Sequence, residues 1–260
     1  MNILAIGDVV GEIGVSALER NLRRIKQENE VDFTVVNGEN AAGVGITPSL
    51  AHRIYTAGAD VITLGNHVWG KREIARFLDE DGYILRPANL ADLAPGRGHG
   101  IFHVKSKMIC VINLIGRCGM DFGPDNPFSC VSRLLRETAR LADFTVIDFH
   151  AGATSEKIAM AYHVDGKVSA LWGTHTHVQT ADECIFPGGL GYVTDIGMTG
   201  PIHSVLGVRI EQSIAMFRGD LTEYFKTAPG DCAVSGAVFE IERGGKCVSV
   251  ERVWKEYKVR

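Results

Sequence analysis

The sequence predicts an α/β fold in which short strands, buried on both faces, alternate with helices. Two observations support this fold class. Six short runs of apolar and β-branched residues each end in glycine or a polar cluster, as strands of parallel sheets do. Apolar residues at helical spacing lie between several of these runs. The predicted strands are the runs that begin at Asn2, Phe33, Val61, Met108, Phe144 and Val168.

Helix start and stop signals mark the connections between the predicted strands. Apolar residues recur at helical spacing over residues 15–25. Thr47 followed by Pro48 predicts a helix N-cap and first helical residue, and Gly58 suits the end of that helix. The Asn126–Pro127 pair introduces a further helical segment with an apolar side.

The C-terminal quarter has a different pattern from the rest of the chain. The segments "CAVSGAVFEIE" and "CVSVERVW" flank "RGGK", which predicts a hairpin of two alternating strands. Because this hairpin is apolar and the loops are short, we expect the protein to form a homo-oligomer.

Composition sets limits on the class of protein. Of the 260 residues, 45% are hydrophobic and 22% are charged, so the chain can bury a large core. A chain of this length fits one α/β domain or two small ones, and we expect residues 1–260 to form a single domain. The formal net charge of −4 argues against a general nucleic-acid-binding surface, so we expect no stable nucleic acid partner.

The sequence favours a cytoplasmic location without a membrane partner. The N-terminus lacks a basic region followed by a long apolar stretch, which a signal peptide requires. No apolar run approaches the roughly 20 residues of a membrane helix. The six cysteines are scattered and form no CxxC motif, which is typical of reduced thiols in a chain of this length.

Side chains that can bind metals or move protons stand where the predicted strands end. In open α/β sheets, the loops at the carboxyl ends of parallel strands converge on one crevice. Five strand ends carry such side chains, so we expect them to meet at one edge of the sheet. They are Asp8, Glu39, Asn40, Asn66, His67, His150, His175 and His177.

These residue types suit a centre of two divalent metal ions. Ions about 3.5–4 Å apart need carboxylate, amide and imidazole ligands with one bridging carboxylate, for which Glu39 is the natural candidate. Because cysteine is absent from these strand ends, a structural tetrahedral zinc site is disfavoured. The ligand types suit Mn, Fe, Co or Zn without choosing among them. His67 is then the spare histidine, able to protonate a leaving oxygen.

Several further motifs leave alternatives open. Arg117, in "LIGRCGM", and His203, in "GPIHSVLG", are candidates for contact with the substrate, although a surface role for Arg117 is the simpler alternative. The segment "GENAAGVG" matches neither a Walker A nor a Rossmann pattern, so we predict no nucleotide cofactor of those types. Glycines flank the candidate ligands and permit sharp turns near the ions, at Gly7, Gly38, Gly65 and Gly173.

The order of the motifs resembles that of a known superfamily. "GD" after the first strand, "GNH", a lone histidine and then "GTHTH" are similar to the motifs of calcineurin-like metallophosphoesterases. Within that superfamily, "NGENAAGVGIT", "LGNHVW", "YHVDGKVSALWGTHTHVQTAD" and "TDIGMTGP" resemble the bacterial YmdB-type phosphodiesterases over essentially the whole chain.

The resemblance implies a fold, an activity and ligand roles. The implied fold is a four-layer α/β/β/α sandwich. The implied activity is hydrolysis of 2′,3′-cyclic nucleotides, with 3′,5′-cyclic nucleotides as further candidates, at a di-iron or di-manganese site. His67 is implied as the proton donor. The first metal would be held by Asp8, Glu39, Asn40 and His177, and the second by Glu39, Asn66, His150 and His175.

Two departures from the wider superfamily leave the metal, and with it the activity, open. Val10 stands where the usual D-x-H motif has histidine, and Glu39 replaces the usual bridging aspartate. A phosphomonoesterase or nucleotidase that uses the same site on a different substrate is an alternative function. A regulatory protein that binds a ligand through its metals, with incidental hydrolysis, is another.

Overall fold

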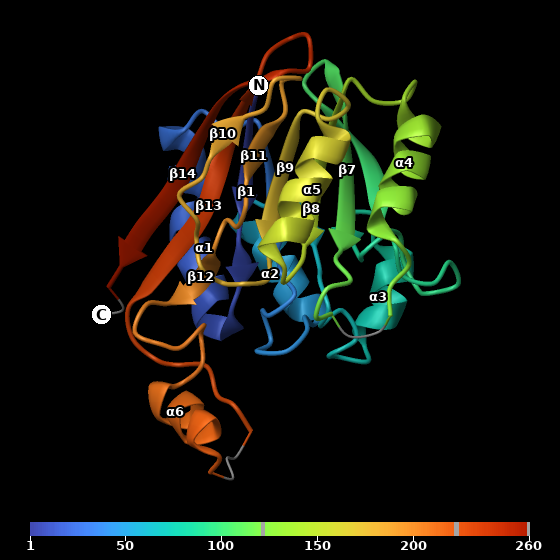
Figure 1. Ribbon diagram of the computed structural model, residues 1–260. Coiled ribbons are helices and arrows are strands. Elements are labelled where there is room, and N and C mark those ends of the chain that lie inside the picture. The colour runs from blue at the N-terminus through green and yellow to red at the C-terminus, as the bar shows by residue number, and fades with distance from the viewer. Residues whose placement is uncertain (121–122, 221–223, 259–260) are drawn as a thin grey trace.

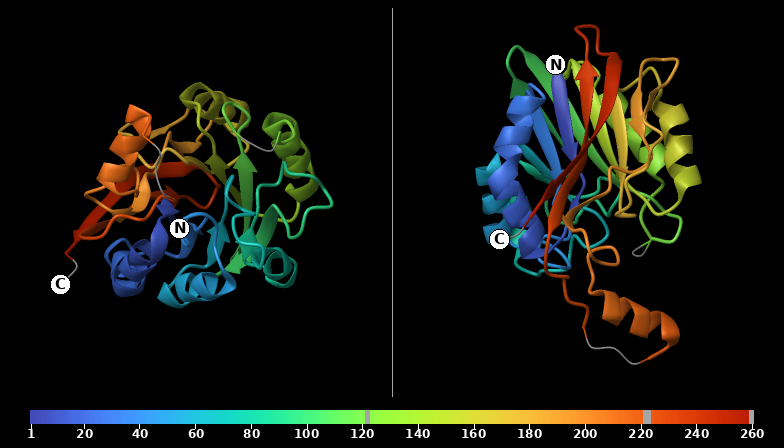
Figure 2. Two further views of the ribbon diagram at one scale, coloured as in Figure 1. Left: turned by 90° about the horizontal axis from the view of Figure 1, so that it is seen from below. Right: turned by 90° about the vertical axis from the view of Figure 1, so that its left-hand side faces the viewer.

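Two β-sheets stack face to face, and helices cover the outer face of each, in the computed structural model of the protein (Figure 1). The structure describes residues 1–120, 123–220 and 224–258. The four layers are seen edge-on in the right-hand view of Figure 2. The predicted α/β/β/α sandwich is therefore confirmed. Its layer helices are α1 (Gly11–Glu28), α2 (Pro48–Ala57) and α3 (Ile74–Glu80) on one side, and α4 (Pro127–Thr138) and α5 (Thr154–Val164) on the other.

The first sheet joins the two ends of the chain. Its strands, in order across the sheet, are β2 (Asp8–Val9), β12 (Met198–Pro201), β13 (Cys232–Ile241), β1 (Asn2–Ile6), β3 (Phe33–Asn37), β4 (Val61–Thr63) and β5 (Ile84–Leu85), with β14 (Cys247–Tyr257) paired to β13. β1 pairs antiparallel with β13, so that Asn2 lies opposite Glu240. From β1 to β5 the pairing is parallel, so the carboxyl ends of these strands lie at the same edge.

The second sheet is formed by the middle of the chain. Its strands, in order, are β10 (Cys184–Ile185), β11 (Gly191–Val193), β9 (Ala170–Thr174), β8 (Phe144–His150), β7 (Lys107–Ile115) and β6 (His99–Val104). The pairing is parallel from β11 through β9 and β8 to β7, and β6 and β10 are antiparallel strands at the two edges. All six strands predicted from apolar runs are present, as β1, β3, β4, β7, β8 and β9.

Alternate residues of the buried strands pack in different apolar cores. Leu4 of β1 faces the helices of the first sheet, whereas its neighbour Ile3 faces the second sheet. The core between the sheets includes Trp172 and Phe239, whose ring centroids are 5.6 Å apart. A third core lies between the second sheet and α4 and α5. Apolar residues on both faces of the strands explain why their sequences are continuous apolar runs.

At one end of the space between the sheets, polar contacts replace the apolar core. Asp148 of β8 accepts hydrogen bonds from Asn37 Nδ2 at 3.1 Å and from Thr63 Oγ1 at 2.5 Å, both in the first sheet. Asn113 of β7 donates through Nδ2 to the Leu64 carbonyl at 2.7 Å. These side chains connect the two sheets directly, close to the carboxyl ends of their parallel strands.

The predicted capping signals and the C-terminal hairpin are also present. Thr47 Oγ1 accepts the Leu50 N–H at 3.2 Å, and Gly58, with φ of 125°, follows the end of α2. Asn126 caps α4 by accepting two backbone N–H groups. β13 and β14 form the hairpin, but β13 is buried along almost its whole length because it lies inside the sheet. Its apolar sequence is therefore explained within the chain, and a homo-oligomer stays a prediction.

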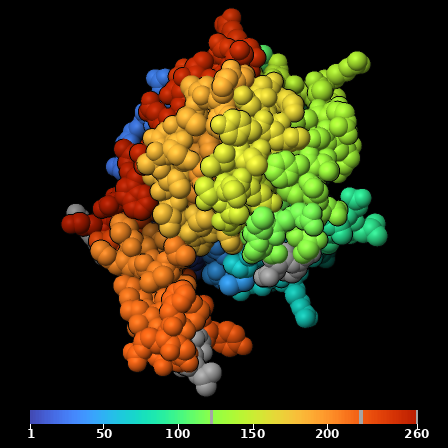
Figure 3. All heavy atoms as spheres, viewed as in Figure 1, coloured from blue at the N-terminus to red at the C-terminus, as the bar shows by residue number. Residues whose placement is uncertain are grey.

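The layer helices α3 and α5 and one further helix, α6 (Ile210–Arg218), were not anticipated from the sequence. α6 extends away from the sheets at the lower end of Figure 1, and Figure 3 shows it as a projection from the body. Ile210, Ile214 and Phe217 recur at helical spacing on α6 and are 45%, 52% and 80% exposed. Their apolar side chains are thus presented to the solvent rather than to the core.

Two further features concern membrane-spanning helices and the cysteines. Within the described ranges, no helix is both long and apolar enough to cross a membrane. All six cysteines are free thiols, and four of them are buried. A cytoplasmic location stays a prediction.

Candidate metal centre

Candidate ligands from both sheets meet at one end of the sandwich, the lower end in Figure 1. Asp8, Glu39 and Asn66 follow strands of the first sheet, whereas His150 ends β8 and His175 follows β9 in the second. The sequence predicted one edge of one sheet. The structure instead brings together the facing edges of two sheets, because strand pairing divides the predicted strands between them.

His150 is the centre of a tight group of candidate ligands. Its Nε2 lies 3.2 Å from Glu39 Oε1, 2.9 Å from Asn66 Oδ1 and 3.1 Å from His175 Nδ1. Ligand atoms of Glu39, His150 and His175 all lie within 4.8 Å of one another. Oxygen and nitrogen atoms that converge so closely are the arrangement that a divalent cation requires.

A hydrogen-bond chain behind His150 fixes which ring nitrogen faces this group. Thr174 Oγ1 donates to Asp148 Oδ1 at 2.7 Å and lies 2.9 Å from His150 Nδ1. Because the hydroxyl proton is committed to Asp148, His150 Nδ1 must carry a proton and donate to Thr174. The Nε2 atom is therefore the one available as a ligand, and outer contacts of this kind orient metal-binding histidines.

His177 belongs to a second group, beside Asp8. His177 Nδ1 donates to the Leu206 carbonyl at 3.0 Å, which leaves Nε2 as the ligand atom. That Nε2 lies 3.9 Å from Asp8 Oδ1 and 3.2 Å from Asn40 Nδ2. The structure thus places His177 beside Asp8 and Asn40, and His175 beside His150.

Asn40 connects the ligand groups to the predicted proton donor. Its Nδ2 lies 3.1 Å from Glu39 Oε1, and its Oδ1 lies 2.7 Å from His67 Nδ1. The amide nitrogen therefore faces the ligands and the oxygen faces His67. A ligand role for Asn40 through Oδ1 requires a half-turn of its amide group.

Electrostatics at the centre favour added positive charge. Burial raises the pKa of Asp8 to about 6, and His177 and His150 offset only part of that effect. Burial alone would raise the pKa of Glu39, but the adjacent His150 imidazole lowers it below its usual range. The same attraction to Glu39 raises the pKa of His150, against the effect of burial. Asp8 Oδ1 is buried without a hydrogen-bond partner, so one carboxylate oxygen stays unmatched.

The backbone of the GTHTH segment turns the two histidines apart. His175 and His177 have φ of 99° and 64°, in the left-handed region that side chains other than glycine rarely occupy. The His175 N–H donates to Asp8 Oδ2 at 3.1 Å, which ties this loop of the second sheet to the first. One short loop therefore contributes a side chain to each ligand group.

His67, the predicted proton donor, lies at the rim of the centre. Its side chain is 38% exposed, and its backbone N–H donates to Glu39 Oε2 at 3.1 Å. Because Nδ1 is held by Asn40, the position of the ring is fixed relative to the ligands. The ring is accessible from solvent, and its role as proton donor stays a prediction.

Gly65 permits this close approach of loops. A Cβ atom at Gly65 would lie 2.3 Å from Glu39 Oε2 and 2.4 Å from His150 Nε2, well inside van der Waals contact. Gly152, at the same end of the sandwich, differs, because its Cβ would lie 3.6 Å from the His175 ring, an ordinary contact distance. Of these two glycines, only Gly65 stands where a side chain would overlap with the candidate ligands.

The two predicted substrate contacts lie on loops at the same end. Arg117 follows β7, and its N–H donates to Glu156 Oε1 at 2.9 Å, while its side chain is exposed. His203 follows β12 and is also exposed. Among the described residues, no hydrogen bond joins either one to the candidate ligands, so their roles stay predictions.

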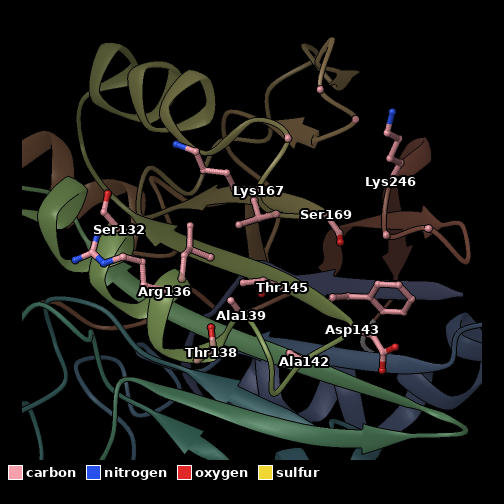
Figure 4. Close-up of a pocket in the computed structure, with 18 residues that line it drawn as sticks. Ser132, Arg136, Thr138, Ala139, Ala142, Asp143, Thr145, Lys167, Ser169 and Lys246 are labelled. Atoms are coloured by element: carbon pink, nitrogen blue, oxygen red, sulfur yellow. The ribbon is translucent and has the colours of Figure 1, made fainter.

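A cavity elsewhere in the molecule takes no part in this centre. It has a volume of about 670 Å³ and lies at the opposite end of the second sheet, beside the first residues of β8 (Figure 4). Arg136, Lys167 and Lys246 line it together with glycine-rich loops. None of the candidate ligands is among its lining residues.

Several buried polar residues behind the ligands were not predicted from the sequence. Asp148 and Thr174 are fully buried within strands, and Lys157 of α5 forms a fully buried ion pair with Asp195. A signal for Asp148 was present in "VIDFH", where a carboxylate interrupts an apolar run two residues before His150. Lysine in a helix is usually solvated, so Lys157 gave no comparable signal.

Comparison with known proteins agrees with the fold and the motifs. A family model described as YmdB-like protein matches residues 4–253. The 2′,3′-cyclic-nucleotide 2′-phosphodiesterase of Bacillus subtilis is 44% identical over 257 residues, which cover 97% of this chain and 96% of that protein.

Two solved structures are similar over almost the full length. A hypothetical protein from Thermus thermophilus has a TM-score of 0.92 and 37% identity, covering 98% of this chain and 99% of that one. A structure described as a novel phosphatase from Mycoplasma pneumoniae has a TM-score of 0.93 and 32% identity, covering 99% of this chain and 94% of that one. The sequence resemblance is confirmed, and the chain belongs to the family of YmdB-like proteins.

Proposed function

We propose that the protein is a metal-dependent phosphodiesterase that hydrolyses small cyclic nucleotides, above all 2′,3′-cyclic nucleotides. The observation that carries this proposal is the convergence of Glu39, Asn66 and His175 on His150 Nε2, with Asp8 and His177 beside them. The Bacillus subtilis relative, described as a 2′,3′-cyclic-nucleotide 2′-phosphodiesterase, supports the choice of substrate.

The residues present fit two divalent ions. Asp8 Oδ1 is a buried oxygen without a partner, and Nε2 is the available atom of both His150 and His177. We infer that iron or manganese is held, with zinc or cobalt also compatible with these ligands. The first ion would be bound by Asp8, Glu39, Asn40 and His177, and the second by Glu39, Asn66, His150 and His175.

The ions and the protein contribute differently to the reaction. Two bound ions would lower the pKa of water and neutralise phosphate oxygens during in-line attack. The chain itself orients the imidazoles through Thr174 and the Leu206 carbonyl. His67, held by Asn40 at the accessible rim, is proposed to protonate the leaving oxygen.

A phosphomonoesterase is the second candidate function, because one close structure is described as a phosphatase. The same ligands could serve a monoester, since ligand geometry alone does not determine how many ester bonds the substrate has.

We also propose that residues 1–260 form one domain. Strands from the C-terminal quarter lie beside β1 in the first sheet, so the chain cannot be cut into two parts that each contain a whole sheet. This interleaving supports the proposal.

Glu39→Gln and His67→Ala should separate metal binding from proton transfer. Glu39→Gln removes the bridging charge, so bound metal and activity should be lost together. His67→Ala should keep the metal but lower kcat about 10²–10⁴-fold, the usual contribution of a general acid. Metal analysis and hydrolysis of bis(p-nitrophenyl) phosphate measure both effects. Wild-type activity of Glu39→Gln with metal present would refute the bridging role.

Substrate preference should distinguish the two candidate functions. One metal-loaded preparation would be assayed with 2′,3′-cyclic AMP, 3′,5′-cyclic AMP and p-nitrophenyl phosphate. We expect the highest kcat/KM with 2′,3′-cyclic AMP. A strong preference for the monoester would favour the phosphomonoesterase instead.

Gly65→Ala should disrupt the centre without unfolding the sandwich. Its methyl group would displace Glu39 and His150, and a displacement of about 1 Å can cost 10²-fold in rate. Gly152→Ala is the matched control, because its methyl group makes only an ordinary contact with His175. Circular dichroism checks folding, and metal titration with kcat/KM measures the centre. Equal behaviour of the two variants would show that Gly65 does not constrain the ligands.

Thr174→Val should weaken metal binding through His150. Valine keeps the shape of threonine but leaves His150 Nδ1 and Asp148 without their shared partner. Loss of such an outer contact typically lowers metal affinity 10–100-fold. Isothermal titration with Mn²⁺ measures the change, and Thr174→Ser, which retains the hydroxyl, should bind nearly as wild type. Unchanged affinity of Thr174→Val would argue against this chain of contacts.

A further inference from the structure

Lys157 and Asp195 form an ion pair that is fully enclosed behind the GTHTH segment. Lys157 Nζ lies 2.7 Å from Asp195 Oδ2, and both side chains are 0% exposed. Lys157 comes from α5, on the outer face of the second sheet, and Asp195 follows β11. Neither side chain is a candidate metal ligand.

Both members of the pair bind the backbone between and around the two histidines. Lys157 Nζ donates to the Thr174 carbonyl at 2.9 Å, immediately before His175. Asp195 Oδ2 accepts the Thr176 N–H at 3.1 Å, between His175 and His177. The peptide groups on both sides of His175 are therefore each fixed by one member of the pair.

Asp195 also reaches the backbone that positions Asp8. Its Oδ1 accepts the Gly197 N–H at 2.9 Å, and the Gly197 carbonyl accepts the Asp8 N–H at 3.1 Å. One carboxylate thus connects the histidine loop of the second sheet to the strand end that carries Asp8. This contact sets the loop and Asp8 relative to each other.

The histidine loop needs such external restraint. Both His175 and His177 have positive φ, a conformation that persists only where the surroundings impose it. If the loop relaxed, the two imidazole rings would no longer point apart. Each ligand group would then no longer receive one imidazole.

Stability alone does not explain a buried ion pair at this position. Removing two charges from water is costly, and well-packed apolar residues are often as stabilising. A Cβ at Gly173 would lie 1.9 Å from the Thr194 carbonyl oxygen and 2.8 Å from both Lys157 Cδ and Cε. Gly173, the first residue of the GTHTH segment, therefore leaves room for the neighbouring backbone and for the lysine stem.

We propose that Lys157 and Asp195 are positioning residues that hold His175 and His177 in their divergent arrangement, so that two metal ions bind together. This inference depends on the proposed two-metal function. It predicts that loss of the pair impairs occupancy of both sites even where the fold is retained.

The test compares the wild type, Asp195→Asn and the double variant Lys157→Met/Asp195→Asn. The double variant removes both charges with little change in side-chain shape, so no unpaired charge is left in the interior. Asp195→Asn keeps one acceptor oxygen but leaves the Lys157 charge unpaired, so its thermal unfolding is compared with that of the double variant. Thermal unfolding, Mn²⁺ titration by calorimetry and the EPR spectrum of the manganese-loaded protein would be recorded for each.

Lys26→Met/Asp60→Asn is the control, matched in its contacts but not in burial, since the Lys26 and Asp60 side chains are 22% and 39% exposed. Lys26 Nζ donates to Asp60 Oδ2 at 3.1 Å and to the Gly58 carbonyl at 2.8 Å, and Asp60 accepts the Thr34 N–H at 2.8 Å. As in the Lys157–Asp195 pair, the lysine also donates to a backbone carbonyl and the aspartate also accepts a backbone N–H. It lies at the amino ends of β3 and β4, away from the centre.

We expect both Asp195 variants to bind Mn²⁺ 10–100-fold more weakly and to lose the spectrum of a coupled manganese pair. The control should show neither change, whatever its unfolding temperature. Two Mn²⁺ ions bound by the double variant with wild-type affinity and an unchanged spectrum would overturn the inference. Failure of the wild type itself to bind two ions would instead refute the proposed function.

Discussion

Four carboxylates are buried among the described residues, and all of them lie at the same end of the sandwich: Asp8, Glu39, Asp148 and Asp195. A carboxylate removed from water needs hydrogen-bond donors or a cation beside it. The residues around the centre supply these partners. Asp148 is matched by hydroxyl and amide donors, Asp195 by Lys157, and Glu39 by His150. Asp8 alone keeps a buried oxygen without a hydrogen-bond partner. Among these four carboxylates, the oxygen without a hydrogen bond thus lies where a cation is proposed to bind.

The centre lies where the two sheets meet and belongs to neither of them alone. The first sheet supplies the carboxylates and amides, and the second supplies His150, His175 and His177. Each histidine for which the tautomer can be assigned is oriented by a contact that needs tertiary structure, such as that of His177 with the Leu206 carbonyl. The ligand geometry is consequently a property of the assembled sandwich, and isolated segments of the chain would not retain it.

Local patterns in the sequence predicted the strands and the candidate ligands, because an apolar run and its terminal residues are neighbours along the chain. They could not predict the division into two sheets, which depends on contacts such as that between Asn2 and Glu240. Nor could they show that His175 and His177 adopt positive φ, since this follows from restraint by distant residues. Lys157 was missed because a helical lysine is normally at the surface, and only tertiary structure reveals its burial.

The polar contacts of Asp148 and Asn113 across the two sheets differ in kind from the apolar contacts of the core between them. Apolar contacts between sheets are non-directional, so they hold the layers together without strictly fixing how far one layer slides along the other. Hydrogen bonds from Asn37 and Thr63 to Asp148 are directional and do fix that offset. The residues that hold the two sheets together are therefore different from those that fix their alignment. Replacing Trp172 or Phe239 by another apolar residue of similar volume should therefore change stability more than the offset of the layers.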